Sequence, residues 1–130
     1  MRKKKTPRAK MKLYLDGLWS KLTKQINDPF CAWCGNPENL QSDHIINRWK
    51  FPTRWRLENC IILCVGCHIF RKKREPMAWA GIVLKKYGQD RVDFLNEMSK
   101  SQEKVDLDQV KRYLENAERE LKPCIIGERA

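Results

Sequence analysis

The sequence predicts an α+β fold, in which a two-stranded hairpin and a following helix lie between an N-terminal helix and a helical C-terminal part. Three observations predict it. Two Cys-x2-Cys pairs, Cys31/Cys34 and Cys64/Cys67, are separated by a long gap. Two short segments with strand character lie inside this gap and at its end. Amphipathic patterns with helical spacing precede and follow the region.

The four paired cysteines predict a single metal site. Two Cys-x2-Cys pairs in a chain of 130 residues are typical of a tetrahedral zinc site with four thiolate ligands. Disulfides are the alternative for a secreted domain, but no apolar signal core follows the first basic residues, and the spacing favours zinc. A zinc ion with four thiolates has no position left for water or substrate, so we expect it to be structural. Of the other two cysteines, Cys60 is expected in the core, and Cys124 as a tail thiol.

The elements before and around the hairpin follow from local patterns. Residues 1–9 are basic, contain Pro7 and lack apolar periodicity, so we expect a flexible basic arm. Apolar residues at helical intervals predict a helix over residues 10–26, which residues 27–29 end. Residues 40–46 and 59–63 are expected to be strands, and residues 48–58 a basic and aromatic loop. The second cysteine pair is expected to open a helix that reaches about Arg74.

Residues 76–130 are expected to form a helical extension within the same compact domain as residues 10–75. Helices are predicted over about 75–87, where Gly88 ends the helix, over about 90–98, and from 106 to Pro123. The last helix carries apolar residues in a seven-residue repeat: Leu107, Val110, Leu114, Ala117 and Leu121. We expect this face to be buried in the core, with a homodimer seam as the alternative.

Positive charge is concentrated in the N-terminal part of the chain. The net charge is +11; residues 1–74 carry 17 Lys/Arg against five Asp/Glu, and residues 75–130 carry 10 against 11. A basic region that coincides with a metal site favours a nucleic acid partner, because contacts of Lys and Arg with phosphates release counterions. A solvated surface is the simpler alternative for an isolated basic run. No apolar stretch approaches the about 20 residues of a membrane span, so we expect a cytoplasmic protein without a membrane partner.

Residues 31–74 resemble the HNH (ββα-metal) endonuclease family. The resemblance rests on CAWC at 31–34, DHII at 43–46, NCIILCVGCH at 59–68 and Lys72. A fainter likeness to phage recombination endonucleases rests on Leu84, Tyr87, Gly88 and Asp90. The resemblance implies a ββα-metal (HNH) core stapled by the four-cysteine zinc site. It also implies a metal-dependent DNA endonuclease that nicks one strand, leaving 5′-phosphate and 3′-hydroxyl ends, in phage or mobile-element DNA processing or recombination.

The same resemblance assigns roles to individual residues. His44 would be the general base, and Asn59 would either orient it through the hairpin loop or reach the metal. Asp43 and His68 would bind the catalytic cation, Mg²⁺ or Mn²⁺, with Zn²⁺ or Ni²⁺ as further options. Because alternate strand residues face opposite ways, Asp43 is expected on the other side of the strand from His44.

The expected partner is double-stranded or branched DNA, in a bacterial or phage-infected cell. A monomer would bind it, or a homodimer that associates through the C-terminal helices. Trp49 or Trp55 would pack under the hairpin loop or wedge against bases. The residues expected to contact DNA are all basic: Arg48, Lys50, Arg54, Arg56, Arg71, Lys72, Lys73 and Arg74.

Two other functions remain open from the sequence. A zinc-ribbon-like nucleic-acid-binding module without catalysis would explain the cysteines and the charge, but not the spacing of Asp43, His44, Asn59 and His68. A zinc-stabilised protein-interaction domain would explain the C-terminal helices, but not the basic half of the chain.

Overall fold

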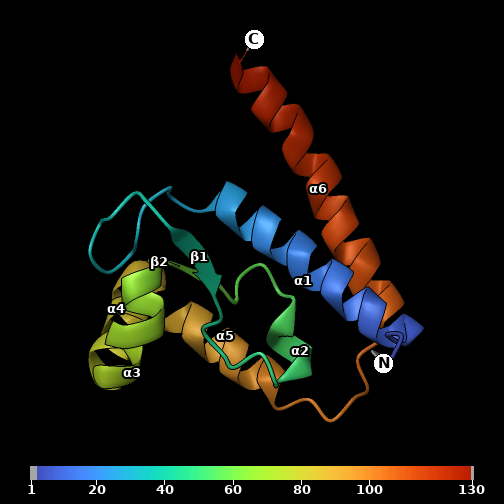
Figure 1. Cartoon of the computed structure of the whole chain (residues 1–130), viewed down its shortest axis with the longest axis horizontal. Coiled ribbons are helices and arrows are strands. Elements are labelled where there is room, and N and C mark those ends of the chain that lie inside the picture. Colours follow the sequence, from blue (N-terminus) through green and yellow to red (C-terminus); the bar gives the residue numbers. More distant parts are fainter. Residues whose placement is uncertain (1–2, 130) are drawn as a thin grey trace.

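In the computed structural model the chain has an α+β fold that is mostly helical, with a small two-stranded sheet (Figure 1). The structure describes residues 3–129, and only the backbone of residues 122–129. In chain order the elements are α1 (Pro7–Ile26), β1 (Leu40–Asp43), α2 (Phe51–Arg54), β2 (Ile61–Cys64), the π-helix η1 (Gly66–Arg71), α3 (Lys72–Arg74), α4 (Pro76–Tyr87), α5 (Gln89–Ser99) and α6 (Leu107–Arg129). None of the helices in this described part combines the length and the apolar character needed to cross a membrane.

Helix α1 begins at Pro7, inside the segment that we expected to be a flexible arm. Thr6 caps it, because its Oγ1 accepts a hydrogen bond of 3.1 Å from the backbone N–H of Ala9. Proline is favourable in the first turn, since the N–H that it lacks would have no helical partner there and its φ is already suitable. The prediction of an arm up to residue 9 was therefore wrong for residues 7–9.

Strands β1 and β2 pair antiparallel, with Leu40 opposite Cys64 and Asp43 opposite Ile61. Strand β1 is three residues shorter than predicted. The side chain of Asn59 explains the difference: it accepts from the N–H of Ile46 at 2.7 Å and donates to the C=O of Ile46 at 3.1 Å. These backbone groups are therefore unavailable to a strand ladder. The second strand starts two residues later than predicted, and the expected loop 48–58 contains the short helix α2.

The buried strand β2 separates two hydrophobic clusters. Alternate side chains point to opposite faces of a strand, so Ile62 packs with α1 and α6, while Ile61 and Leu63 pack with the paired cysteines and with Val83 of α4. Cys60 is 1 % exposed and belongs to the first cluster, which confirms that it is a core residue. The first cluster consists of Leu15, Leu18, Trp19, Leu22, Trp55, Cys60, Ile62, Leu107 and Leu114.

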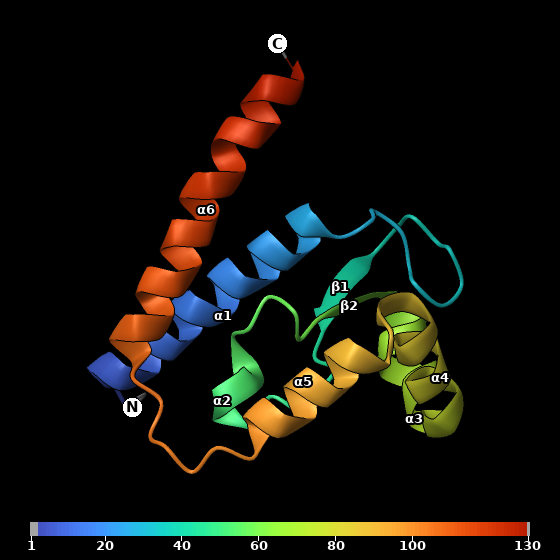
Figure 2. The same ribbon diagram turned by 180° about the vertical axis from the view of Figure 1, so that it is seen from behind.

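The C-terminal helices agree with the sequence in most of their boundaries. Helix α4 ends at Tyr87, and Gly88 follows it with a φ of 89°, which suits glycine. Asp106 caps α6, because its Oδ1 accepts from the N–H of Asp108 at 2.9 Å. The apolar repeat of α6 packs against α1, near which α6 starts before the two helices diverge (Figure 2). Leu107 and Leu114 of this face are buried within the chain, and Val110, Ala117 and Leu121 are half-buried against the same cluster.

Two sequence expectations concern the last residues. Helix α6 passes Pro123 and continues to Arg129, although proline was expected to end it. The side chain of Cys124, expected to be a tail thiol, lies outside the described residues.

Candidate functional site

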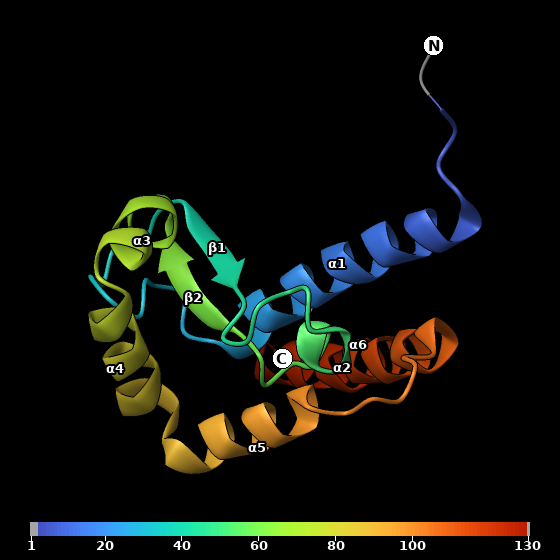
Figure 3. The same cartoon turned by 90° about the horizontal axis from the view of Figure 1, so that it is seen from below.

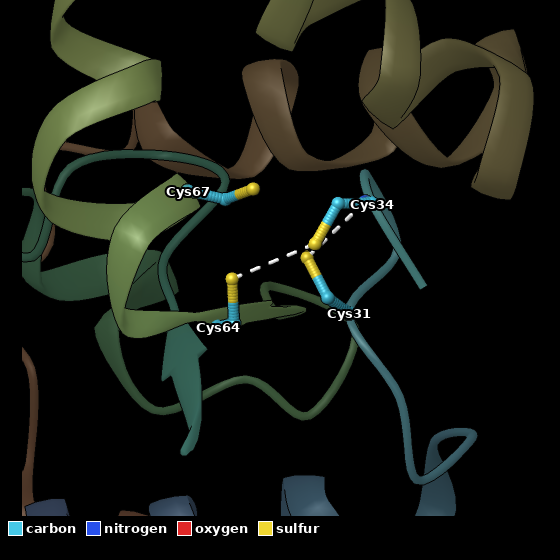
Figure 4. Close-up of side chains that lie close together, drawn as sticks. All are labelled: Cys31, Cys34, Cys64 and Cys67. Carbon is cyan, nitrogen blue, oxygen red and sulfur yellow. Dashed lines mark hydrogen bonds between the residues drawn. The ribbon is translucent and has the colours of Figure 1, made fainter. Parts of the chain in front are cut away.

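The four paired cysteines converge in space (Figure 4). Cys31 and Cys34 lie in the turn before β1, Cys64 ends β2, and Cys67 lies on η1. Their sulfur atoms all lie within 4.8 Å of one another, and the Sγ atoms of Cys34 and Cys64 are 3.6 Å apart. Four thiolates around a tetrahedral zinc ion, with Zn–S bonds of about 2.3 Å, would have sulfurs about 3.8 Å apart. The cluster can therefore hold a metal ion such as zinc.

The electrostatics of the cluster suit a cation. Burial alone would raise the pKa of Cys31, but hydrogen bonds from neighbouring backbone N–H groups, including those of Trp33 and Cys34, outweigh it and lower the pKa to about 6. Burial and the nearby thiols raise the pKa of Cys67 to about 12. Four sulfurs this close cannot all become thiolates without a positive ion between them, because like charges repel. The cysteines among the described residues are free thiols and not disulfides.

The π-helix η1 links this cluster to a second group of polar side chains. Its widened turn follows β2 directly, and π-helical turns are frequent at functional sites. The consecutive residues Cys67 and His68 point to different neighbours: Cys67 is buried in the thiol cluster, and His68 contacts Asp43 of β1. Figure 3 shows the hairpin and the following helical segment at one end of the molecule, with α1 running away from the hairpin towards the N-terminus.

The second group centres on the carboxylate of Asp43, which is 5 % exposed. Its Oδ1 lies 3.1 Å from Nε2 of His68, and its Oδ2 lies 2.7 Å from Nζ of Lys72. Burial on its own would raise the pKa of Asp43, but the hydrogen bonds from His68 and Lys72 lower it below its ordinary value. On the other side of the His68 ring, Nδ1 lies 2.6 Å from Oε1 of Gln41. An amide oxygen can only accept, so Nδ1–H donates this hydrogen bond. The structure thus brings together Asp43 and His68, the two predicted cation ligands.

His44, the next residue after Asp43, faces another environment. Its ring stacks on Trp19 of α1 with a centroid distance of 4.1 Å, and its Nε2 lies 2.9 Å from the backbone oxygen of Arg54. A carbonyl oxygen can only accept, so Nε2 carries the proton and Nδ1 keeps a lone pair in the neutral ring. Burial lowers the pKa of His44 below its ordinary value, although the hydrogen bond to Arg54 and the charge of Asp43 act in the opposite direction.

Asn59 holds the segment between the two strands. It is 0 % exposed, and besides its two bonds to Ile46 it donates to the backbone oxygen of Thr53 at 2.9 Å. Its amide oxygen and nitrogen are therefore used inside the loop. Of the two predicted roles for Asn59, this geometry favours positioning of the loop over contact with a metal ion.

Asp16 of α1 also holds the segment between β1 and β2, through contacts with Arg54 and Trp55. Its carboxylate accepts from Nε and a terminal nitrogen of Arg54, at 3.1 and 2.7 Å, and from Nε1 of Trp55 at 2.8 Å. Arg54 was expected to contact DNA, but it is 5 % exposed and is an internal charge, because its guanidinium is committed to Asp16. The contact between Asp16 and Arg54 also fixes the position of the Arg54 carbonyl, which holds His44.

The other basic residues expected to contact DNA differ in accessibility. Arg48, Lys50, Lys73 and Arg74 are exposed. Arg56 bonds to Glu58 at 2.7 Å and stacks on Tyr113, and Arg71 stacks on Trp33, so both are partly engaged. Lys72 is held by Asp43. The two tryptophans of the loop also separate: Trp55 is 2 % exposed and Trp49 is 76 % exposed.

Three residues that contact the predicted site were missed from the sequence: Asp16, Trp19 and Gln41. Asp16 carried a signal, since it is the one acidic residue among the first 27 and a lone acid in a basic segment implies an internal partner. Gln41 lies two positions before Asp43 and so shares its face of the strand. Trp19 carried no signal beyond its place on the apolar face of a helix.

Comparisons of the chain with protein-family models, with curated proteins and with solved structures find no match in any of the three.

Proposed function

We propose that this chain is a metal-dependent DNA endonuclease of HNH type, with a ββα-metal core that a structural zinc ion staples through the four cysteines. The observation that carries the proposal is the pair Asp43 and His44. These consecutive residues leave the end of β1 in different directions, one towards His68 and the other towards Trp19 and the Arg54 carbonyl. A carboxylate and an imidazole that can bind a metal ion, next to a second imidazole with a fixed orientation, are the groups that phosphodiester hydrolysis needs.

His44 is the general base in this proposal. Its Nε2–H is held by the Arg54 carbonyl, so the lone pair of Nδ1 is the one that takes a proton from the attacking water. Stacking on Trp19 fixes the plane of the ring, and Asn59 fixes the loop that carries the Arg54 carbonyl. Burial disfavours the protonated ring, so the imidazole is neutral, and competent as a base, near pH 7.

Asp43 and His68 would hold the catalytic divalent cation, Mg²⁺ or Mn²⁺. The donor set fits: one carboxylate oxygen and one imidazole nitrogen lie 3.1 Å apart. Gln41 accepts from Nδ1 of His68, which orients Nε2 towards the site, as outer hydrogen bonds commonly do for histidine ligands. When bound, such an ion supplies positive charge to the phosphate oxygens and to the leaving oxygen.

The overall reaction balances as a hydrolysis. The oxygen of water forms a bond to phosphorus, the bond from phosphorus to the 3′ oxygen breaks, and His44 takes one proton of the water. The leaving 3′ oxygen takes a proton from solvent, and His44 later returns its proton to solvent. The products are a 5′-phosphate and a 3′-hydroxyl on one strand. One site of this kind cuts one strand, so the expected product from supercoiled DNA is a nicked circle.

One observation favours a second candidate, a zinc-ribbon-like nucleic-acid-binding module without catalysis. The ammonium of Lys72 lies 2.7 Å from Oδ2 of Asp43 and already neutralises this buried carboxylate. A cation at Asp43 must displace or share this contact. In the second candidate, the Asp43–Lys72 pair is purely structural.

A nicking experiment separates the two candidates. The purified, zinc-loaded chain is incubated with supercoiled plasmid and Mg²⁺, Mn²⁺, Ni²⁺ or Zn²⁺, beside a His44→Gln variant and an exposed control, Gln102→Ala. Glutamine can still donate to the Arg54 carbonyl but cannot act as the base at pH 7. We expect nicking by the wild type and the control, and a loss of about 10²-fold to 10⁴-fold in His44→Gln with unchanged DNA affinity. Equal nicking by His44→Gln would remove His44 from its role, and binding without cleavage under all conditions would favour the second candidate.

A further inference from the structure

Trp49 is a large aromatic side chain that the fold leaves in solvent. It is 76 % exposed, whereas Trp19 and Trp55 are 3 % and 2 % exposed in the adjoining core. Tryptophan is usually well buried because of the apolar area that it contributes. An indole presented to solvent by an ordered segment is therefore a candidate contact for a partner.

The segment that carries Trp49 is held in place on both sides. The backbone N–H of Trp49 donates to Oδ1 of Asn47 at 2.9 Å, and that of Lys50 donates to the backbone oxygen of Asn47 at 2.9 Å. The base of the loop is closed by Asn59 and anchored to α1 by Asp16. Because the loop is already ordered, binding of a partner to Trp49 costs little conformational entropy, which favours affinity.

The charges around Trp49 indicate the chemistry of the partner. The guanidinium of Arg48 lies 5.9 Å from the centre of the indole and forms a long ion pair of 3.4 Å with Asp16, and Lys50, the next residue along the chain, is exposed. Residues 44–57 contain no acidic residue. Lys12 of α1 also reaches this loop, with its ammonium 5.5 Å from the ring of Phe51. An exposed aromatic side chain with basic neighbours in the chain matches a strand that alternates phosphates with flat bases.

We propose that Trp49 stacks on an unpaired base and makes the chain prefer DNA in which a base has left the duplex stack. The inference rests on the proposed function in one respect, that DNA is the partner. Arg48 and Lys50 would contact phosphates without regard to sequence or pairing. The indole would discriminate, because a base within an intact duplex has both faces covered by its neighbours, whereas an unstacked base has a face free for the indole.

The test measures binding, so that it is independent of cleavage. Zinc-loaded chain carrying His44→Gln, which prevents cutting, is titrated into a fluorescein-labelled duplex and into the same duplex with one extruded base. Trp49→Ala is compared with Trp49→Phe, with Lys50→Ala, and with Phe70→Ala, a control that removes an aromatic ring 60 % exposed on η1. In a parallel titration, 2-aminopurine replaces the extruded base and reports stacking through quenching of its emission.

We expect Trp49→Ala to weaken binding of the extruded-base duplex by about tenfold, with less than a twofold effect on the perfect duplex. Trp49→Phe should retain part of the preference and of the quenching. Lys50→Ala should weaken both duplexes alike, and Phe70→Ala should change neither.

Equal weakening of both duplexes by Trp49→Ala, or no change in either, would overturn the inference, as would quenching that persists without the indole. Binding of anionic phospholipid vesicles that depends on Trp49, without any preference for the extruded base, would reassign the side chain to a membrane surface. If the wild-type chain leaves plasmid uncut but prefers the extruded-base duplex through Trp49, the proposal of a nuclease is refuted and this inference still holds.

Discussion

Replacing Asp16 by alanine is expected to lower the free energy of unfolding by about 3 kcal/mol. The carboxylate accepts two hydrogen bonds from Arg54 and one from Trp55, at 2.7 to 3.1 Å, and a longer one of 3.4 Å from the exposed Arg48. The side chain of Arg54 is 6 % exposed, so its charge would be left buried without a partner.

The size of this loss in unfolding free energy follows from the burial of Arg54 and Trp55, the partners of Asp16. Hydrogen bonds to charged groups contribute about 1.5–3 kcal/mol each, which would give more than about 4 kcal/mol for the three shorter bonds from Arg54 and Trp55. Removal of one member of a buried ion pair costs about 3–5 kcal/mol. The side chain of Asp16 is 27 % exposed, so water partly screens the ion pair and can replace part of the lost hydrogen bonding. We therefore take about 3 kcal/mol, the low end of these two estimates.

The chain offers a matched control for this measurement. Asp28 forms an ion pair with Lys86 at the same distance, 2.7 Å, but its side chain is 57 % exposed. Asp28→Ala should therefore cost less than about 1 kcal/mol. Urea unfolding in excess zinc gives both values, and a double-mutant cycle of Asp16→Ala with Arg54→Met should give a coupling energy of about 2 kcal/mol. A loss no larger than that of Asp28→Ala, or additive effects in the cycle, would refute the internal role assigned to this contact.

The site supports four further predictions. Cys31→Ser should release the metal ion and abolish cooperative unfolding, because structural zinc contributes on the order of 10 kcal/mol to small domains; a stable zinc-loaded variant would contradict this. Asn59→Ala should destabilise the fold by about 2–4 kcal/mol and speed hydrogen exchange in the loop, as it removes three buried hydrogen bonds; unchanged exchange would count against it. Lys72→Met should tighten Mn²⁺ binding by about tenfold in electron paramagnetic resonance titrations, because it removes the ammonium that competes with the ion for Asp43. An unchanged affinity would show that the Lys72 ammonium and Mn²⁺ do not compete. Partial burial lowers the pKa of the His44 ring, so the unfolded chain binds a proton first and stability should fall as the pH drops below about 6.5. The difference in unfolding free energy between wild type and His44→Gln, measured at several pH values, should show this slope, and a constant difference would contradict it.

Local patterns in the sequence were enough to predict the main elements and the cysteine cluster. Periodic apolar residues determine which face of α1 and α6 is buried, and paired thiols need only a short turn to converge on one ion. Local patterns were less reliable at the ends of elements. Pro7 starts a helix instead of preventing one, and β1 stops early because Asn59, a residue from the far side of the loop, takes the hydrogen bonds of Ile46.

The tertiary structure alone decided how the polar residues of the predicted site are supported. The contacts of Asp16 with Arg54, of Trp19 with His44 and of Gln41 with His68 join residues that are between 25 and 38 positions apart. Their formation depends on how α1 and η1 pack on the hairpin, which no local pattern determines. The same packing buried Trp55 and left Trp49 in solvent, although the two have similar basic neighbours in the sequence. Sequence thus determined the chemical groups and their order, and the packing of distant segments determined which of those groups meet and which reach solvent.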